Sequence, residues 1–205
     1  KIIITGSATR IGASIAKSLA GHGTQITLHY NKSMKAVKNL KKELESLGSE
    51  VFLIKADLSI MSQTKKIIPS ACKMMKGLDC LINNASVFEK DDLINFNEKS
   101  FNKHMAVNLQ APAKLTQDFK KYLKSKKGNI INIIDQRIFK LTPFFFSYTL
   151  SKTGLQTLTK TSAMKLAPNI RVNGIAPGPT IKNKRQTDKH FKKQWKSLIL
   201  KDKVD

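Results

Sequence analysis

Short apolar runs alternate with amphipathic stretches along almost the whole chain, and this alternation constrains its fold more than any other feature. The apolar runs read KIIIT, QITLHY, EVFLIKADL, DCLINNA, NIINII and NIRVNGIAPGP. Helical periodicity between them predicts helices near residues 11–20, 34–47, 63–75, 100–124 and 148–166. This pattern predicts an α/β fold, a Rossmann-like doubly wound parallel sheet with strand order 3-2-1-4-5-6 and helices on both faces. Ligands of such sheets bind at the carboxyl ends of the strands.

The chain has the size and composition of one globular domain, because 205 residues with 40% hydrophobic and 25% charged side chains are ordinary values for a single domain. Its apolar runs are too short to span a bilayer, and it opens directly into a strand. We therefore expect no membrane association, no signal peptide and a cytoplasmic location. Cys72 and Cys80 do not form a disulfide framework, and we expect no metal. No strand pattern follows the final helix-like stretch, so we expect a chain truncated at its C-terminus, without a seventh strand.

The net charge of +23 comes almost entirely from lysine, since the chain has only four arginines. Proteins that read nucleic acids favour arginine for bidentate contacts, and these lysines are spread along the chain. A lysine-coated surface is therefore the better interpretation, and a nucleic-acid partner is not expected. The charge should still attract anionic ligands such as a phosphorylated cofactor.

A glycine-containing turn, TGSATRIG, joins the first strand to the first helix. Gly6 permits a tight turn, and Gly12 lets the start of the helix, at Ile11, pack closely. The helix N-terminus then offers backbone N–H groups to a pyrophosphate. The turn departs from G-x-G-x-x-G, because Arg10 takes the place of the middle glycine.

The cofactor is predicted from the end of the second strand. A site for NAD(H) usually has an acidic residue there, but none occurs between Lys1 and Lys42. A lysine and a hydroxyl suit a 2′-phosphate, so NADP(H) is favoured over NAD(H), although a solvated loop is the alternative. Asp57, followed by Leu58, is placed to bind the adenine amino group or to cap the next helix. The predicted phosphate-binding segment consists of His29, Tyr30, Asn31, Lys32 and Ser33.

Tyr148 and Lys152 are spaced four residues apart, so a helix places them on one face. The ammonium favours the phenolate, so we expect a lowered pKa for Tyr148, suited to proton transfer. Asp135 precedes Tyr148 by thirteen residues and would act against this effect. The alternative for Asp135 is a turn residue after its strand.

The motifs TGSATRIG, KADLS, LINNAS, VNLQAP, SYTLSK and IRVNGIAPGPT resemble, in order and spacing, those of the short-chain dehydrogenases/reductases. The resemblance covers about residues 2–195. Within that family, Arg10 in the phosphate loop, NNAS followed by Val87-Phe88, HYNKS, and Asp135 in place of the active-site serine are similar to the pteridine reductases and bacterial dihydropterin/dihydrofolate reductases.

The resemblance implies a role for each matching position. Tyr148 would donate the proton, and Lys152 would assist it and bind the nicotinamide ribose. Asn108 would hold a water or backbone link in the proton relay. Phe88 would stack on the pterin, with the nicotinamide on its other side, although core packing is the alternative. Arg10 would reach the pyrophosphate and the pterin, Ser86 would face the pterin, and further cofactor contacts would come from Asn84, Ala85, Ser86, Pro177, Gly178 and Thr180.

The implied reaction is reduction of a dihydropterin, such as dihydrobiopterin, dihydromonapterin or dihydrofolate, by NADPH. Tyr148 and Asp135 would together supply the proton. Residues 180–200 would cover the substrate, and their basic part, KNKRQTDKHFKK, would suit a folate glutamate tail or form a solvated face. The family resemblance also implies a homo-oligomer, a dimer or a tetramer.

Two other functions are left open by the sequence. One is an ordinary short-chain reductase of a carbonyl, such as a 3-oxoacyl thioester or a sugar. The other is a non-catalytic sensor of NADP(H). Asp135, Arg10 and Phe88 distinguish the pterin hypothesis from the first alternative, and the presence of Tyr148, Lys152 and Asn108 argues against the second.

Overall fold

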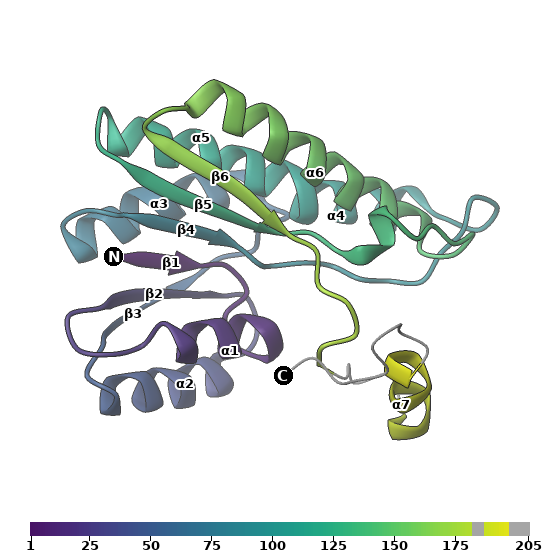
Figure 1. Cartoon of the computed structure of the whole chain (residues 1–205), viewed down its shortest axis with the longest axis horizontal. Coiled ribbons are helices and arrows are strands. Elements are labelled where there is room, and N and C mark those ends of the chain that lie inside the picture. Colours follow the sequence, from purple (N-terminus) through teal and green to yellow (C-terminus); the bar gives the residue numbers. More distant parts are fainter. Residues whose placement is uncertain (182–186, 197–205) are drawn as a thin grey trace.

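A computed structural model describes residues 1–181 and 187–196 of the chain (Figure 1). Its centre is a parallel sheet with the order β3-β2-β1-β4-β5-β6, which confirms the predicted order. The strand order reverses between the parallel strands β1 and β4, and ligands of doubly wound sheets bind in the crevice at such a point. The strands are β1 (Ile2–Ile4), β2 (Gln25–Tyr30), β3 (Glu50–Lys55), β4 (Cys80–Asn83), β5 (Gly128–Ile133) and β6 (Ile170–Ile175).

Helices lie on both sides of the sheet, with α1 and α2 on one face and α3, α4, α5 and α6 on the other (Figure 1). The helix α7 lies away from the sheet in the same view. None of the helices in the described part of the chain is long and apolar enough to cross a membrane. The helices are α1 (Arg10–Ser18), α2 (Met34–Ser46), α3 (Met61–Met75), α4 (Glu98–Met105), α5 (Ala111–Leu123), α6 (Phe146–Leu166) and α7 (Asp188–Lys196).

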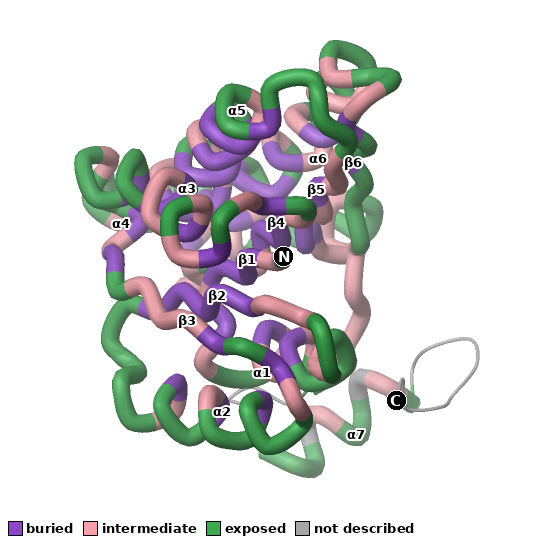
Figure 2. The backbone as a smooth tube through the Cα atoms, turned by 90° about the vertical axis from the view of Figure 1, so that its left-hand side faces the viewer, coloured by how far each residue is buried: buried purple, intermediate pink, exposed green. Residues whose placement is uncertain are grey.

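Two hydrophobic cores, one on each side of the sheet, hold these layers together. Neighbouring strand residues point to opposite faces, so Ile3 enters the core under α3 and α5, while Ile4 enters the core under α1 and α2. Figure 2 shows the buried segments concentrated in the central strands and the helical turns that face them. Each fully buried Ile or Leu stabilises the fold by about 1.5–3 kcal/mol. These cores fix the strand ends from which the site is built.

The helix expected over residues 100–124 is divided in the structure. Between α4 and α5 lies a π-helical segment, Ala106–Gln110, in which the N–H of Ala111 bonds to the carbonyl of Ala106. Pro112 has no N–H to bond to the carbonyl of Asn108, which an α-helix would require. Such bulges occur often at functional sites, and this one carries Asn108.

Candidate active site

A cavity of about 940 Å³ lies at the carboxyl ends of the strands, where the sequence predicted it. This is within the size range of small-molecule and cofactor sites. Most of the predicted site residues line it: Gly6, Arg10, Ile11, Gly12, His29, Asn31, Lys32, Asp57, Leu58, Asn84, Ala85, Ser86, Phe88, Asp135, Tyr148, Lys152, Pro177 and Gly178.

Four predicted site residues do not line this cavity. Tyr30 is buried in the core beside α2, where its hydroxyl donates to Sδ of Met34 at 3.2 Å, so its side chain faces away from a cofactor. Ser33 is exposed at the start of α2. Thr180 lines a separate apolar hollow beside α1. Asn108, the fourth, is fully buried behind the cavity wall.

The phosphate loop is too tight for side chains at its two glycines. Gly6 has φ +62°, and a Cβ there would lie 2.8 Å from Cα of Ala85. A Cβ on Gly12 would lie 2.5 Å from the carbonyl oxygen of Gly6 and 2.5 Å from Nδ2 of Asn84. The loop therefore lies against the end of β4, and α1 begins directly beside the cavity. Its N-terminal N–H groups fit the pyrophosphate of a dinucleotide.

Arg10 has a left-handed backbone, with φ +54°, in the position where the standard motif has glycine. This conformation costs a non-glycine residue on the order of 1–2 kcal/mol. The side chain crosses to the segment after β6, where Nη2 donates to the carbonyl of Ile181 at 3.0 Å. Arg10 thus links the phosphate loop to the segment that was expected to cover the substrate. Of that segment, residues 182–186 and 197–200 lie outside the described residues, whereas Ile181 and Phe191 line the cavity.

His29 lines the cavity, as predicted, with a ring that burial keeps uncharged. Its Nδ1 accepts from the N–H of Gly6 at 3.1 Å, and its Nε2 lies 3.1 Å from the carbonyl of Ala56. Burial lowers the pKa of His29 to about 4. A neutral imidazole cannot neutralise a phosphate at pH 7, so Asn31 and Lys32 remain as the predicted 2′-phosphate contacts. His29 instead joins the ends of β1, β2 and β3.

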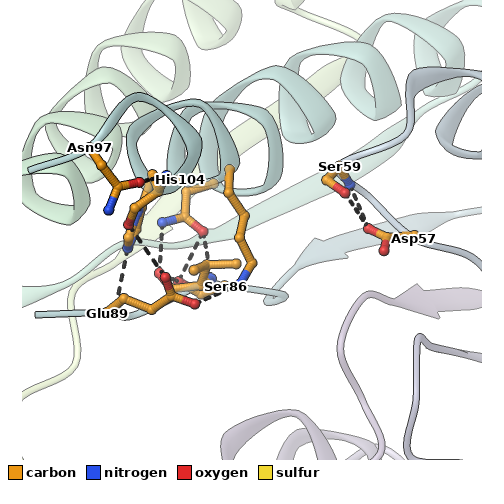
Figure 3. Close-up of polar contacts among 10 residues, drawn as sticks. Asp57, Ser59, Ser86, Glu89, Asn97 and His104 are labelled. Atoms are coloured by element: carbon orange, nitrogen blue, oxygen red, sulfur yellow. Dashed lines mark hydrogen bonds and ion pairs between the residues drawn. The ribbon is translucent and has the colours of Figure 1, made fainter.

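Asp57 does not cap a helix, because α3 begins four residues later with Ile60 as its cap residue. Its Oδ1 accepts from the N–H of Ser59 at 2.9 Å and from the hydroxyl of Ser59 at 2.6 Å (Figure 3). These hydrogen bonds hold the pKa of Asp57 below its usual value, with smaller contributions from Asn31 and Lys32. An ionised carboxylate at the edge of the cavity can accept from the amino group of an adenine.

Tyr148, Asp135 and Lys152 meet at the other end of the cavity. The hydroxyl of Tyr148 donates to Oδ2 of Asp135 at 2.6 Å, and Nζ of Lys152 donates to the carbonyl of Ile133 at 2.8 Å. Both Tyr148 and Lys152 come from the first turns of α6, and both are buried. Asp135 follows β5, and its Oδ1 accepts from the N–H of Arg137 at 2.8 Å. Asp135 is therefore a turn residue after its strand, the alternative that the sequence left open, and its carboxylate also binds Tyr148.

The pKa of Tyr148 is raised, so the expectation of a lowered value was wrong. Burial is the largest cause, and the negative charge of Asp135 is the next. Lys152 lies with Nζ 5.8 Å from the centre of the tyrosine ring, and burial lowers its own pKa to about 8. Tyr148 thus keeps its proton at neutral pH and shares it with Asp135.

Asn108 connects the wall of the cavity to α6. Its Oδ1 accepts from the N–H of Val87 at 2.8 Å and from the hydroxyl of Ser86 at 3.2 Å. Its Nδ2 donates to the carbonyl of Val87 at 3.0 Å and to Oγ of Ser151 at 2.9 Å. These bonds use the full capacity of the amide, so the expected relay water has no partner on this side chain. Asn108 positions Ser86 and the helix that carries Tyr148.

A second cluster of hydrogen-bonded residues holds the loop after β4 in place (Figure 3). The N–H of Glu89 donates to Nε2 of His104, and Nδ1 of His104 lies 2.8 Å from the carbonyl of Ser100. Oε1 of Glu89 also forms an ion pair with Lys103 at 2.6 Å. Sequence reasoning missed this group, because a histidine and a lysine inside a helix carry no motif. It fixes the loop that contains Phe88.

Phe88 stacks on Phe145, with ring centres 4.4 Å apart and planes 4° apart. Its ring also meets the ring of Tyr148 edge-on at 4.6 Å. The packing alternative is therefore present in the structure, and one face of Phe88 is covered by protein. Phe88 nevertheless lines the cavity next to Tyr148, so aromatic surface borders the position where a flat substrate would meet the proton donor.

The sequence profile of the family described as short chain dehydrogenase matches residues 1–193. The chain belongs to this family. Its structure is similar to that of FolM alternative dihydrofolate reductase 1 from Brucella canis complexed with NADP, with a TM-score of 0.93 and 38% identity over 98% of this chain and 80% of that one.

Other short-chain dehydrogenases resemble the chain less closely. The 3-oxoacyl-acyl-carrier-protein reductase FabG of Staphylococcus epidermidis is 29% identical over 178 residues, which are 86% of this chain and 73% of that protein. Human dehydrogenase/reductase SDR family member 4 is 32% identical over 183 residues, again 86% of this chain. The chain spans 64% of the length of the human protein.

The structure of this short-chain dehydrogenase also brings residues into the cavity that sequence reasoning did not select. They occur in loops after the strands, where side chains can enter the site without any periodic pattern. Proximity in sequence to Asp135 and Tyr148 could have indicated some of them. The missed residues that line the cavity include Thr9, Ser59, Lys90, Gln136, Arg137 and Phe145.

Proposed function

We propose that this chain is an NADPH-dependent reductase that reduces a dihydropterin, such as dihydrobiopterin, dihydromonapterin or dihydrofolate, in the cytoplasm. The hydrogen bond of 2.6 Å between Tyr148 and Asp135 is the observation that carries the proposal. It places a protonated phenol and a carboxylate together at the aromatic end of the cavity. Similarity to an enzyme that is described as a dihydrofolate reductase and was solved with NADP supports it.

The residues of the cavity fit NADPH in three respects. The glycines of the phosphate loop leave room for a pyrophosphate at the start of α1, and Asp57 can accept from the adenine amino group. Lys32 and Asn31 line the cavity at the end of β2, and residues 1–42 contain no acidic residue. The carboxylate of Asp57 lies beside both. When bound, NADPH supplies the hydride.

The protein supplies the proton. Reduction of a C=N bond adds hydride to carbon and a proton to nitrogen, so a group that holds a proton at neutral pH must lie beside that nitrogen. Tyr148 holds one, because burial and Asp135 raise its pKa. Its hydroxyl can donate to the substrate while Asp135, which now accepts from it, can take up the replacement proton. Lys152 contributes a buried positive charge that opposes the build-up of negative charge on this pair.

Reduction of a carbonyl, as in a 3-oxoacyl thioester or a sugar, is the alternative, and the similarity to FabG favours it. Tyr148 and Lys152 would serve both reactions. Asp135 separates them, because a hydrogen-bonding hydroxyl at this position would be sufficient for a ketone. A role for the carboxylate is expected only where the product nitrogen must be protonated.

Turnover assays test the proposal. The purified chain is given NADPH with dihydrobiopterin or dihydrofolate, and in parallel with a 3-oxoacyl thioester and a sugar carbonyl. We expect oxidation of NADPH with the pterins and much slower oxidation of NADH. Asp135→Ser should lower pterin turnover by about 100-fold, the range typical of a general acid or base. Full pterin activity in Asp135→Ser, or activity on carbonyls alone, would refute the proposal.

A further inference from the structure

Arg137 is a cation at the substrate end of the cavity, and the proposed proton transfer assigns no role to its side chain. It lies two residues after Asp135, and its guanidinium carbon sits 4.4 Å from the ring centre of Phe145 and 5.6 Å from that of Phe88. Its Nη1 donates only weakly, to Oγ1 of Thr142 at 3.3 Å. Stacking on the two rings holds the guanidinium beside the aromatic wall of the substrate site.

Lys90 is a second cation on the same wall. It follows Phe88 by two residues, lines the cavity, and places Nζ 5.1 Å from the ring centre of Phe144. Within residues 1–181 and 187–196, no carboxylate forms an ion pair with Arg137 or Lys90. The acid closest in sequence to Arg137, Asp135, is already bound to Tyr148 and to the backbone of Arg137. Of the two acids that flank Lys90, Glu89 pairs with Lys103, and Asp91 is buried and accepts from the N–H of Ser147. Two cations in one cavity without an acidic partner point to an anion that comes with the ligand.

The position of Arg137 separates it from the 2′-phosphate end of the cofactor. Lys32 and the phosphate loop follow β2 and β1, whereas Arg137 follows β5 and Lys90 follows β4. In the sheet order, β5 lies three strands from β2. Strands are about 4.8 Å apart, so Lys32 and Arg137 follow strands that are roughly 14 Å apart across the sheet. The phosphate loop and Lys90 follow the neighbouring strands β1 and β4. Arg137 lies over the ring of Phe88, which meets the ring of Tyr148, so the anion that it fits belongs to the molecule at Tyr148, which is the proposed substrate.

We propose that Arg137 and Lys90 form an anion subsite that selects a substrate with an acidic substituent. This inference rests on the proposed function and makes its substrate class narrower. The substituent would be the carboxylates of a folate or the phosphate of a phosphorylated dihydropterin side chain. Both bind a guanidinium and an ammonium by the same charge-assisted hydrogen bonds.

The test compares kcat/KM for three substrates in wild-type protein and in Arg137→Gln. Dihydroneopterin is the uncharged reference, dihydroneopterin monophosphate adds a phosphate, and dihydrofolate adds carboxylates. We expect kcat/KM for at least one acidic substrate, relative to the reference, to fall about tenfold in Arg137→Gln, mainly through KM. Lys90→Gln should lower the same ratio, and Arg137→Lys should restore part of it.

Lys140→Gln is the matched control, because it removes the same charge from the segment after β5 at an exposed residue that does not line the cavity. Its ratios should equal those of the wild type. If the relative kcat/KM in Arg137→Gln falls for dihydrofolate alone, the subsite binds carboxylates. If it falls for dihydroneopterin monophosphate alone, the subsite binds phosphate. Unchanged ratios for both acidic substrates in Arg137→Gln would overturn the subsite while leaving the proposed function intact. Wild-type protein that turns over none of the three, nor dihydrobiopterin or dihydromonapterin, would refute the proposed function and the subsite with it.

Discussion

The buried ring of His29 should make the folded state sensitive to acid. Its pKa is about 4 in the folded protein, against 6.5 for the unperturbed side chain. Above pH 6.5 the ring is neutral in both the folded and the unfolded chain, so it contributes no pH dependence. Below pH 6.5 only the unfolded chain binds the proton, until the folded ring also titrates near pH 4. Each pH unit in this window changes the free energy of unfolding by about 1.36 kcal/mol. His29 should therefore lower the free energy of unfolding by about 3 kcal/mol between pH 6.5 and pH 4.

The variant His29→Gln isolates this contribution because glutamine does not titrate. At pH 7.5 we expect it to be less stable than the wild type by about 1–3 kcal/mol, since the N–H of Gly6 loses its buried acceptor. This deficit should shrink by about 3 kcal/mol on going to pH 4, because only the wild type loses stability through residue 29. Urea unfolding followed by far-ultraviolet circular dichroism at a series of pH values measures the difference.

The control is His22→Gln, which removes an exposed histidine from the loop before β2. Its unfolding free energy should follow that of the wild type across the whole pH range. If the curves of wild type and His29→Gln instead run parallel between pH 7.5 and pH 4, the ring at position 29 is not held neutral by burial. In that case it would again be available as a cation for the 2′-phosphate.

Two further predictions concern the catalytic end of the cavity. Burial lowers the pKa of Lys152 to about 8 and Asp135 opposes this shift, so activity that needs the ammonium should fall as pH rises through about 8. Asp135→Asn should move this fall in kcat to lower pH, and an unmoved pH profile would show that the two charges are not coupled. Asn108→Ala should destabilise the protein by about 1–3 kcal/mol, because the N–H of Val87 loses its acceptor and Oγ of Ser151 loses the donor Nδ2. Urea unfolding measures this change, and a loss below about 1 kcal/mol would mean that water replaces the amide.

The sequence predicted the sheet well because strand order follows from local pattern and general rules of connection. Six apolar runs with helical stretches between them leave few arrangements, since crossover connections between parallel strands are right-handed. Most of the predicted site residues line the cavity, because they follow strands and so gather at one edge of the sheet. Tyr30 was assigned wrongly for the same reason. It ends β2 beside true cavity residues, but alternation turns its side chain into the core.

The sequence by itself determined the family motifs, the sheet and the identity of the proton-bearing groups, because these depend on residue type and spacing along one strand or helix. Only the tertiary structure decided how those groups behave. The pKa of Tyr148 rises because residues distant in the chain bury it beside Asp135, and no local spacing reports burial. The neutral state of His29 and the position of Arg137 over two phenylalanine rings likewise depend on several strands and loops meeting at one edge of the sheet. Desolvation and charge interactions act through space, so they are set by the fold that the sequence makes and not by the order of its residues.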